Sequence, residues 1–224
     1  MIVDRFVEFS QALWLLAFGF YAWDVARLVP RGTLLLREAR GARLVPVLAP
    51  FPFELARKEL YLAGLFVPWR AVLVTRWSGG APDGAQSVER ADQLLGAVLP
   101  LRLAAAFNFV LLFVVAPALT ATIGLGGALL IVVAPIYLTN ALAGAQVVFD
   151  HQRFGVTRAS AAWLFADVML CGPYGANWVK RIARLQPELA ADPAQLEGRM
   201  TSVDRERLAG VIALRRNPAA AREE

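Results

Sequence analysis

The chain has 224 residues, of which 58% are hydrophobic and 18% are charged, and its formal net charge is +5. This composition predicts one membrane domain with short polar extensions, because the length leaves no room for a large separate soluble domain. The single cysteine excludes an intrachain disulfide, and the single histidine would leave a metal site almost entirely to carboxylates, of which we find no cluster.

The first apolar segment, residues 6–29, predicts an uncleaved anchor helix. Asp24 and Arg27 interrupt it near its end, where both side chains could extend to the lipid headgroups. A cleaved signal peptide is the alternative. The residues before the apolar core carry no net positive charge, however, and no small-x-small cleavage site follows, so we favour the anchor.

The stretch of residues 33–47 mixes apolar triplets with arginines around Gly41. It fits either a short amphipathic helix or a hairpin. Three prolines at positions 46, 50 and 52 then favour extended backbone, because the residue before a proline avoids the helical region.

Residues 54–77 predict an interfacial or re-entrant element on the cytoplasmic side of the membrane. Glu54 and Lys58 have the i,i+4 spacing of an ion pair that supports a helix. A full crossing by residues 60–75 is the alternative, but it would bury Arg70 in the hydrocarbon.

The longest apolar run, residues 101–148, predicts a tight hairpin of two membrane-spanning helices over 101–123 and 125–148. Each segment holds about twenty apolar residues, roughly the number that a helix needs to cross ~30 Å of hydrocarbon. Arg102 is the only charge in the run, and glycines at 124, 126 and 127 mark the reversal of the chain.

Two prolines and two asparagines stand out within the hairpin. The sequence Val-Val-Ala-Pro ends at Pro117 and again at Pro135, and both prolines lie equally far from Gly126, hence at matching depth. We interpret them as packing kinks, with a paired hinge as the functional alternative. Asn108 and Asn140 lie toward the cytoplasmic half of the hairpin, where we expect a structural hydrogen bond between its helices.

Residues 159–185 predict further interfacial or re-entrant helices. The apolar stretch 159–171 would rise only about 20 Å as a helix, too little for a crossing. A crossing by residues 159–178 is the alternative, but it would export the basic residues that follow. Beyond it, apolar residues recur at helical spacing opposite basic ones, a pattern typical of a membrane-surface helix. The apolar set is Trp178, Ile182 and Leu185, and the basic set is Lys180, Arg181 and Arg184.

Arginines predict the orientation. Five of them follow the first helix between residues 27 and 43, and only Arg5 precedes it, so the N-terminus should lie outside and the C-terminus in the cytoplasm. Residues 1–185 then form the membrane domain, and residues 186–224 form a soluble cytoplasmic helical tail. The excess of arginine over lysine is typical of a GC-rich genome and indicates a bacterial inner membrane.

Few side chains suggest chemistry. Asp150 and His151 follow the hairpin, and Asp167 lies in an apolar stretch, a setting that suits proton or cation handling. The structural interpretation is favoured, with Asp150 and His151 at a solvated helix end and Asp167 in an ion pair. The partners considered for Asp167 are Arg70, Arg153 and Arg158. We find no pattern for a catalytic, cofactor or metal site.

The sequence therefore predicts an all-α integral membrane protein with three transmembrane helices and cytoplasmic interfacial helices. It favours a noncatalytic subunit or scaffold of a membrane complex over an enzyme. We expect basic side chains to contact anionic lipid headgroups, and a membrane protein or a second copy as partner. A compact basic recognition motif is missing, which argues against nucleic acid. The alternative is a small transport or lipid-handling protein that uses Asp167, His151 and the proline-kinked hairpin.

Overall fold

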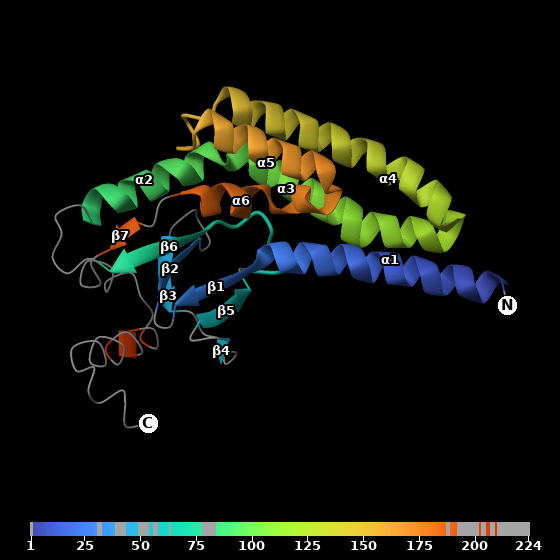
Figure 1. Ribbon diagram of the computed structural model, residues 1–224, viewed down its shortest axis with the longest axis horizontal. Helices are drawn as coiled ribbons and strands as arrows, with labels where there is room; N and C mark the ends of the chain where they lie inside the picture. The colour runs from blue at the N-terminus through green and yellow to red at the C-terminus, as the bar shows by residue number, and fades with distance from the viewer. Residues whose placement is uncertain are drawn as a thin grey trace. The chain divides into compact units, whose positions relative to one another are not determined.

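The computed structural model of the chain describes residues 2–30, 33–38, 44–48, 54–55, 58–62, 64–77, 84–186 and 189–191, with four further positions near the C-terminus (Figure 1). Most described residues are helical. The chain divides into two compact units, each considered by itself below. The helical unit comprises Met1–Ala26, Leu62–Ala71 and Leu94–Gln186, and the strand unit comprises Arg27–Tyr61, Val72–Gln93 and Pro187–Glu224.

The helical unit is built from four long helical segments and three short ones. Its elements are α1 (Ile2–Val25), α3 (Leu99–Val110), the π-helical turn η1 (Leu111–Val115), α4 (Ala116–Phe149), α5 (Arg158–Leu170), the 3-10 helix η2 (Gly172–Asn177) and α6 (Trp178–Leu185). The continuous stretch Leu99–Phe149 is the described helix that is long and apolar enough to cross a membrane, and Ala12–Val25 is a shorter apolar helix.

The predicted reversal of the apolar run is present at Gly124. This residue has φ +79° and ψ +166°, which interrupts the helical backbone inside α4 and favours glycine. Figure 1 shows the chain turning back there, so that the second part of α4 runs beside α3 and η1. We call Leu99–Phe149 the hairpin from here on.

The two prolines of the hairpin lie beside a common apolar core. Pro117 follows the π-helical turn η1, where the Ala116 N–H donates to the Leu111 carbonyl five residues earlier. Pro135 lies inside α4, and the Thr139 hydroxyl donates to its carbonyl at 2.7 Å. Their interpretation as packing kinks stays a prediction. The core consists of Leu112, Ala116, Val132 and Ile136, with Trp14 of α1 packed against it.

An aromatic cluster joins α1 to the first half of the hairpin. Phe18 and Tyr21 of α1 pack against Phe109 and Phe113, with ring centroids 5.0–6.2 Å apart in tilted and edge-on arrangements. Such aromatic pairs add about 0.5–1.5 kcal/mol each to the burial of apolar area. The first helix is therefore an integral part of the helical unit.

Helix α5 packs closely on α4. Thr157 caps its N-terminus, because its side chain accepts a hydrogen bond from the Ser160 N–H at 3.1 Å. Gly144 of α4 lies against the ring of Phe165, and a Cβ atom at this glycine would be only 2.0 Å from the ring. A side chain larger than hydrogen therefore does not fit at position 144.

Gly144→Ala should separate α4 from α5 and destabilise the protein by about 1–3 kcal/mol, the usual effect of overpacking. Thermal unfolding of the purified protein in detergent measures this change. Gly126→Ala is the matched control, because a Cβ atom there meets nothing within 4 Å. Equal melting temperatures for the two variants would contradict the packing of Phe165 on Gly144.

The strand unit contains two sheets and most of helix α2 (Gly84–Ala97). In the first sheet the strand order is β1 (Ala26–Pro30), β5 (Lys58–Leu62) and β4 (Glu54–Leu55). The second has the order β3 (Leu44–Leu48), β2 (Leu34–Glu38), β6 (Val72–Trp77) and β7 (Leu189–Ala191). Strand β2 pairs antiparallel with both β3 and β6, whereas β7 pairs parallel with β6.

These strands correct the all-α fold class and the helix expected over residues 54–77. Glu54 and Lys58 do not form one helical turn, because they belong to β4 and β5, which pair antiparallel. β-Branched residues favour extended backbone in β6. Pro46, which has no N–H to donate, lies in β3 at the edge of its sheet, where a proline is tolerated. The alternative of a hairpin over residues 33–47 is the correct one.

The bounds of two other predicted segments also change. The first helix ends at Val25, and residues 26–29 of the expected anchor belong to strand β1. The expected helical tail begins with strand β7 at Leu189–Ala191. The four isolated positions described beyond it are helical, and the remainder of the tail lies outside the described residues.

Candidate functional site

Charged side chains gather in the interior of the helical unit, around the end of α1. Asp24 is only 5% exposed, and Lys180 and Arg181 of α6 are also buried. Burial of an ion is costly unless it is paired, so this arrangement identifies the polar centre of the unit. We call it the charge cluster, which consists of Asp24, Asp167, Asn177, Lys180, Arg181 and Arg184.

The Asp24 carboxylate accepts four hydrogen bonds. Arg181 donates from Nε to Oδ2 and from Nη2 to Oδ1, both at 3.0 Å, in the bidentate geometry that suits a guanidinium. Arg184 Nη1 donates to Oδ1 at 3.2 Å, and Asn177 Nδ2 donates to Oδ2 at 3.0 Å. The carboxylate therefore joins α1 to both η2 and α6.

Arg181 connects the buried carboxylate to an exposed one. Its Nη1 lies 3.3 Å from Oδ2 of Asp167, whose side chain is 59% exposed. The guanidinium also stacks on Tyr174, 4.0 Å from the ring centroid. Two carboxylates and an aromatic face thus surround one arginine, which fixes its position.

Lys180 has a different environment. Its ammonium donates to the Gly64 carbonyl at 2.8 Å and lies 5.8 Å from the centre of the Tyr21 ring. Gly64 has φ +59°, a conformation that favours glycine. Burial lowers the pKa of Lys180 to about 7; Asp24 opposes this shift and Arg184 adds to it. Near neutral pH this lysine is therefore charged in only part of the molecules.

The environment of α6 corrects the prediction of a membrane-surface helix. Trp178 and Ile182 are fully buried as the apolar pattern requires, but Lys180 and Arg181 are buried with them, and Leu185 is exposed. The basic side of the helix turns inward because Asp24 and the Gly64 carbonyl compensate it there.

The predicted proton-handling residues are not joined by the interactions described here. Asp150 is exposed, and His151 Nδ1 lies 3.2 Å from the Val148 carbonyl oxygen at the end of α4. Asp167 pairs with Arg181 instead of the three arginines considered from the sequence, and it faces solvent more than protein. Asp167 thus pairs with an arginine as expected, but with a different one.

The two asparagines of the hairpin form a buried hydrogen bond. Asn108 Nδ2 donates to Asn140 Oδ1 at 2.7 Å, and Trp178 Nε1 donates to the same oxygen at 3.3 Å. Gly175 lies so close that a Cβ atom there would be 2.0 Å from this oxygen. The bond thus links both helices of the hairpin to α6 and η2, consistent with a structural role.

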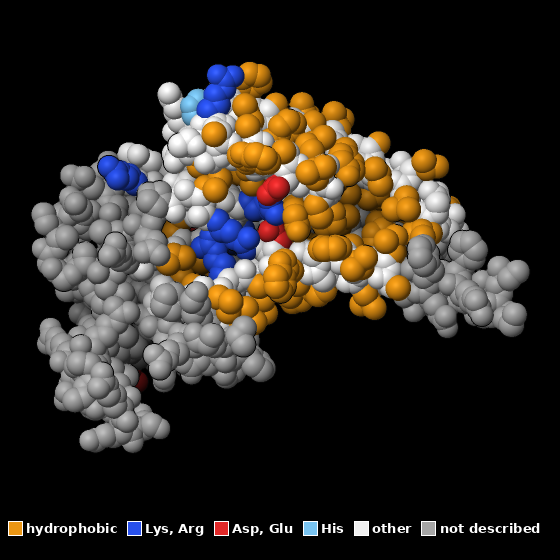
Figure 2. Space-filling model, viewed as in Figure 1, with side chains coloured by type: hydrophobic (Ala, Val, Ile, Leu, Met, Phe, Trp, Pro, Cys, Tyr) orange, Lys and Arg blue, Asp and Glu red, His pale blue; other side chains and the backbone are white. Residues whose placement is uncertain are grey.

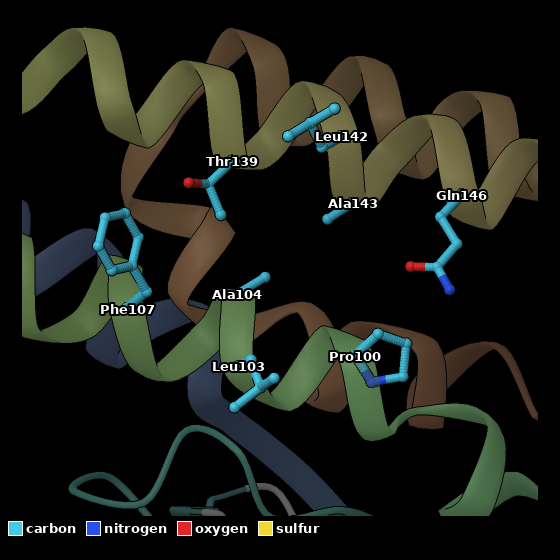
Figure 3. A pocket seen from close by; sticks show the side chains of 8 residues that line it. All are labelled: Pro100, Leu103, Ala104, Phe107, Thr139, Leu142, Ala143 and Gln146. Carbon is cyan, nitrogen blue, oxygen red and sulfur yellow. The ribbon is translucent and has the colours of Figure 1, made fainter.

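An open groove of about 410 Å³ runs between α3 and α4. Figure 3 shows Pro100 and Gln146 at one end and Phe107 and Thr139 at the other. Its lining is mostly apolar, and the Thr139 hydroxyl is already bonded to the Pro135 carbonyl. The groove suits an apolar chain better than a reaction that moves protons. The remaining lining residues are Leu103, Ala104, Leu142 and Ala143.

The chemistry available in these places is limited. Burial raises the pKa of the Cys171 thiol, which disfavours the thiolate needed for nucleophilic attack. Among the described residues, no group of three or more His, Cys, Asp and Glu side chains is placed to hold a metal ion. The charge cluster, with its carboxylates paired to arginines, acts as a structural connection between helices.

Sequence reasoning missed the central residues of the cluster. Asp24 was interpreted as a headgroup contact at a helix end, and Arg181 as part of an exposed basic face. One signal could have indicated their pairing: a carboxylate and an arginine that both border apolar segments each need a partner once buried.

No protein family, no curated protein and no solved structure matches this chain.

Asp24→Asn should leave the buried Arg181 and the half-buried Arg184 without their shared carboxylate and destabilise the protein by about 3–5 kcal/mol. Asp167→Asn is the matched control, since an exposed ion pair contributes roughly 0–1 kcal/mol. Melting temperatures of both variants in detergent measure the difference. A melting temperature of Asp24→Asn as high as that of Asp167→Asn would rule out the structural role of Asp24.

Proposed function

We propose that the chain is a multi-pass protein of a bacterial inner membrane and serves as a noncatalytic subunit or scaffold of a membrane complex. Three helical segments would span the bilayer: α1, the first half of the hairpin up to Gly124, and the second half. The observation that carries this proposal is the exposed apolar surface of the hairpin.

The exposed side chains of the hairpin suit lipid or another membrane protein. Leu103, Leu130, Leu138 and Leu142 are all well exposed, and Figure 2 shows hydrophobic side chains over most of the described surface on this face. Each half of the hairpin holds about 25 helical residues, which rise ~37 Å, enough for the hydrocarbon core. In water such a surface would promote aggregation.

The polar contacts inside the helical unit suit a scaffold better than a catalyst. The Asp24 carboxylate is bonded to Arg181, Arg184 and Asn177, and the asparagine pair of the hairpin is bonded to Trp178. These contacts hold α1, the hairpin and α6 in one arrangement. A rigid unit with an apolar exterior suits a protein that positions partners in the membrane.

The groove between α3 and α4 favours the second candidate, a small transport or lipid-handling protein. Its apolar lining and open side would accept an acyl chain. A transport mechanism that uses His151 and Asp167 has less support. His151 lies against the Val148 carbonyl, whereas Asp167 pairs with Arg181.

Reporter fusions test the topology. Fusions after Trp77, at Gly126 and after Arg184 should report the cytoplasm, the outside and the cytoplasm, because nearly all the arginines that flank the spans lie on one side. An outside signal after Arg184 would mean that the region of α5 crosses, and the three-span arrangement would be abandoned.

Extraction of the tagged chain in a mild detergent tests the role as a subunit. The chain should migrate in native electrophoresis well above its 24.4 kDa and carry one membrane protein in fixed ratio, since its exposed apolar surface needs a partner. Gly126→Ala, whose fold should be intact, serves as the control and should keep the same ratio. Migration of the wild-type chain as a monomer would count against a subunit or scaffold.

A further inference from the structure

When Lys180 is protonated, the charge cluster holds one more positive than negative side chain. Lys180, Arg181 and Arg184 face the two carboxylates of Asp24 and Asp167. The ion pairs between described residues use both arginines. Among those residues, the ammonium of Lys180 has a carbonyl oxygen and an aromatic ring as neighbours but is in no ion pair. A buried ammonium without a counterion is a position where an anion would relieve the excess charge.

The charge cluster reaches the surface at the Asp167 carboxylate and, among its basic side chains, at Arg184. This side chain is 29% exposed and lies one helical turn from Lys180 on α6. Its Nη1 donates to Asp24 and its Nη2 to the Ala26 carbonyl. A terminal guanidinium nitrogen carries two hydrogens, so each of these two nitrogens has one left for another acceptor.

The surroundings of Arg184 are those of a membrane interface. Trp23, next to Asp24 in the chain, is 79% exposed, and Leu185, next to Arg184, is exposed as well. Figure 2 shows basic and acidic side chains gathered at one place within a field of hydrophobic ones. Exposed tryptophans and arginines beside apolar helices are typical of the headgroup layer.

We propose that the exposed edge of Arg184 binds the phosphate of an anionic phospholipid headgroup, which supplies the negative charge that the cluster lacks beside Lys180. The proposal rests on the membrane location proposed above and adds a specific ligand and position to it. A planar guanidinium matches phosphate oxygens in geometry and charge, and basic sites between helices near the cytoplasmic surface bind such headgroups.

This binding should depend on pH. Among the described residues, the groups that face Lys180 are Asp24 and Tyr21 of α1, Arg184 of α6 and the Gly64 carbonyl. A phosphate nearby favours the charged ammonium, so the lipid and a proton bind together. Affinity is then greatest below the pKa of about 7 and falls as the pH rises through it.

Lipid retention tests the site. The full chain is reconstituted in vesicles of phosphatidylglycerol and phosphatidylcholine in equal amounts and re-extracted in detergent, and the bound phospholipids are measured. The wild type should retain phosphatidylglycerol preferentially. In Arg184→Gln this preference should fall about fivefold, the factor that corresponds to ~1 kcal/mol per basic residue near an anionic surface. The control Arg153→Gln removes an exposed arginine outside the cluster and should keep the preference.

Two further measurements keep the test decisive if Arg184→Gln does not fold. The preference of the wild type should weaken between about pH 6 and about pH 9, and Lys180→Gln, which retains a donor for Gly64, should lose this dependence on pH.

Inorganic phosphate at millimolar concentration should not release the lipid. Equal retention of both lipids by the wild type, or release by inorganic phosphate, would overturn the proposal. The topology fusions do not depend on these results, so a failed headgroup site is distinguishable from a failed membrane assignment.

Discussion

The helical unit depends on the compensation of one buried carboxylate. Asp24 lies at the end of an apolar helix, where an unpaired charge would destabilise the fold by several kcal/mol. Four hydrogen bonds from Arg181, Arg184 and Asn177 satisfy it, and they require that η2 and α6 pack against α1. The close approach of Gly175 to Asn140 and the Trp178 hydrogen bond then connect the same short helices to the hairpin. Polar contacts thus hold the apolar helices of this unit in register.

The distribution of side chains is consistent with this dependence. The hairpin exposes leucine, isoleucine and valine, whereas the described charges of α6 lie inside or at the edge of the unit. In the membrane location proposed above, apolar burial alone would specify such an arrangement poorly, because lipid is as apolar as the helix surfaces. Small residues allow close packing where the geometry needs it, as Gly144 does beneath Phe165. Hydrogen bonds and close packing together supply the specificity that the hydrophobic effect does not.

The hairpin could be predicted from the sequence because it depends on local features: a long apolar run, glycines at the turn and a matched pair of asparagines. The charge cluster could not, because Asp24 and Arg181 are 157 positions apart and each borders an apolar segment that explains its position equally well. The periodicity of α6 places Trp178 and Ile182 on one apolar face, but it cannot show that this face packs inside the protein or that the opposite face is buried too. The hairpin of β2 and β3 is local and is one of the two alternatives that the sequence offers. The pairing of β2 with β6 could not be predicted for a similar reason, since the two strands are short and distant in sequence.

A double-mutant cycle between Asp24 and Arg181 tests most directly whether their pairing organises the helical unit. The free energies of unfolding of Asp24→Asn, Arg181→Gln and the double variant are compared with the wild type in one detergent. Our account predicts that the double variant is more stable than the sum of the single effects allows, with a coupling energy above about 1 kcal/mol. Additive effects, with a coupling energy near zero, would contradict it.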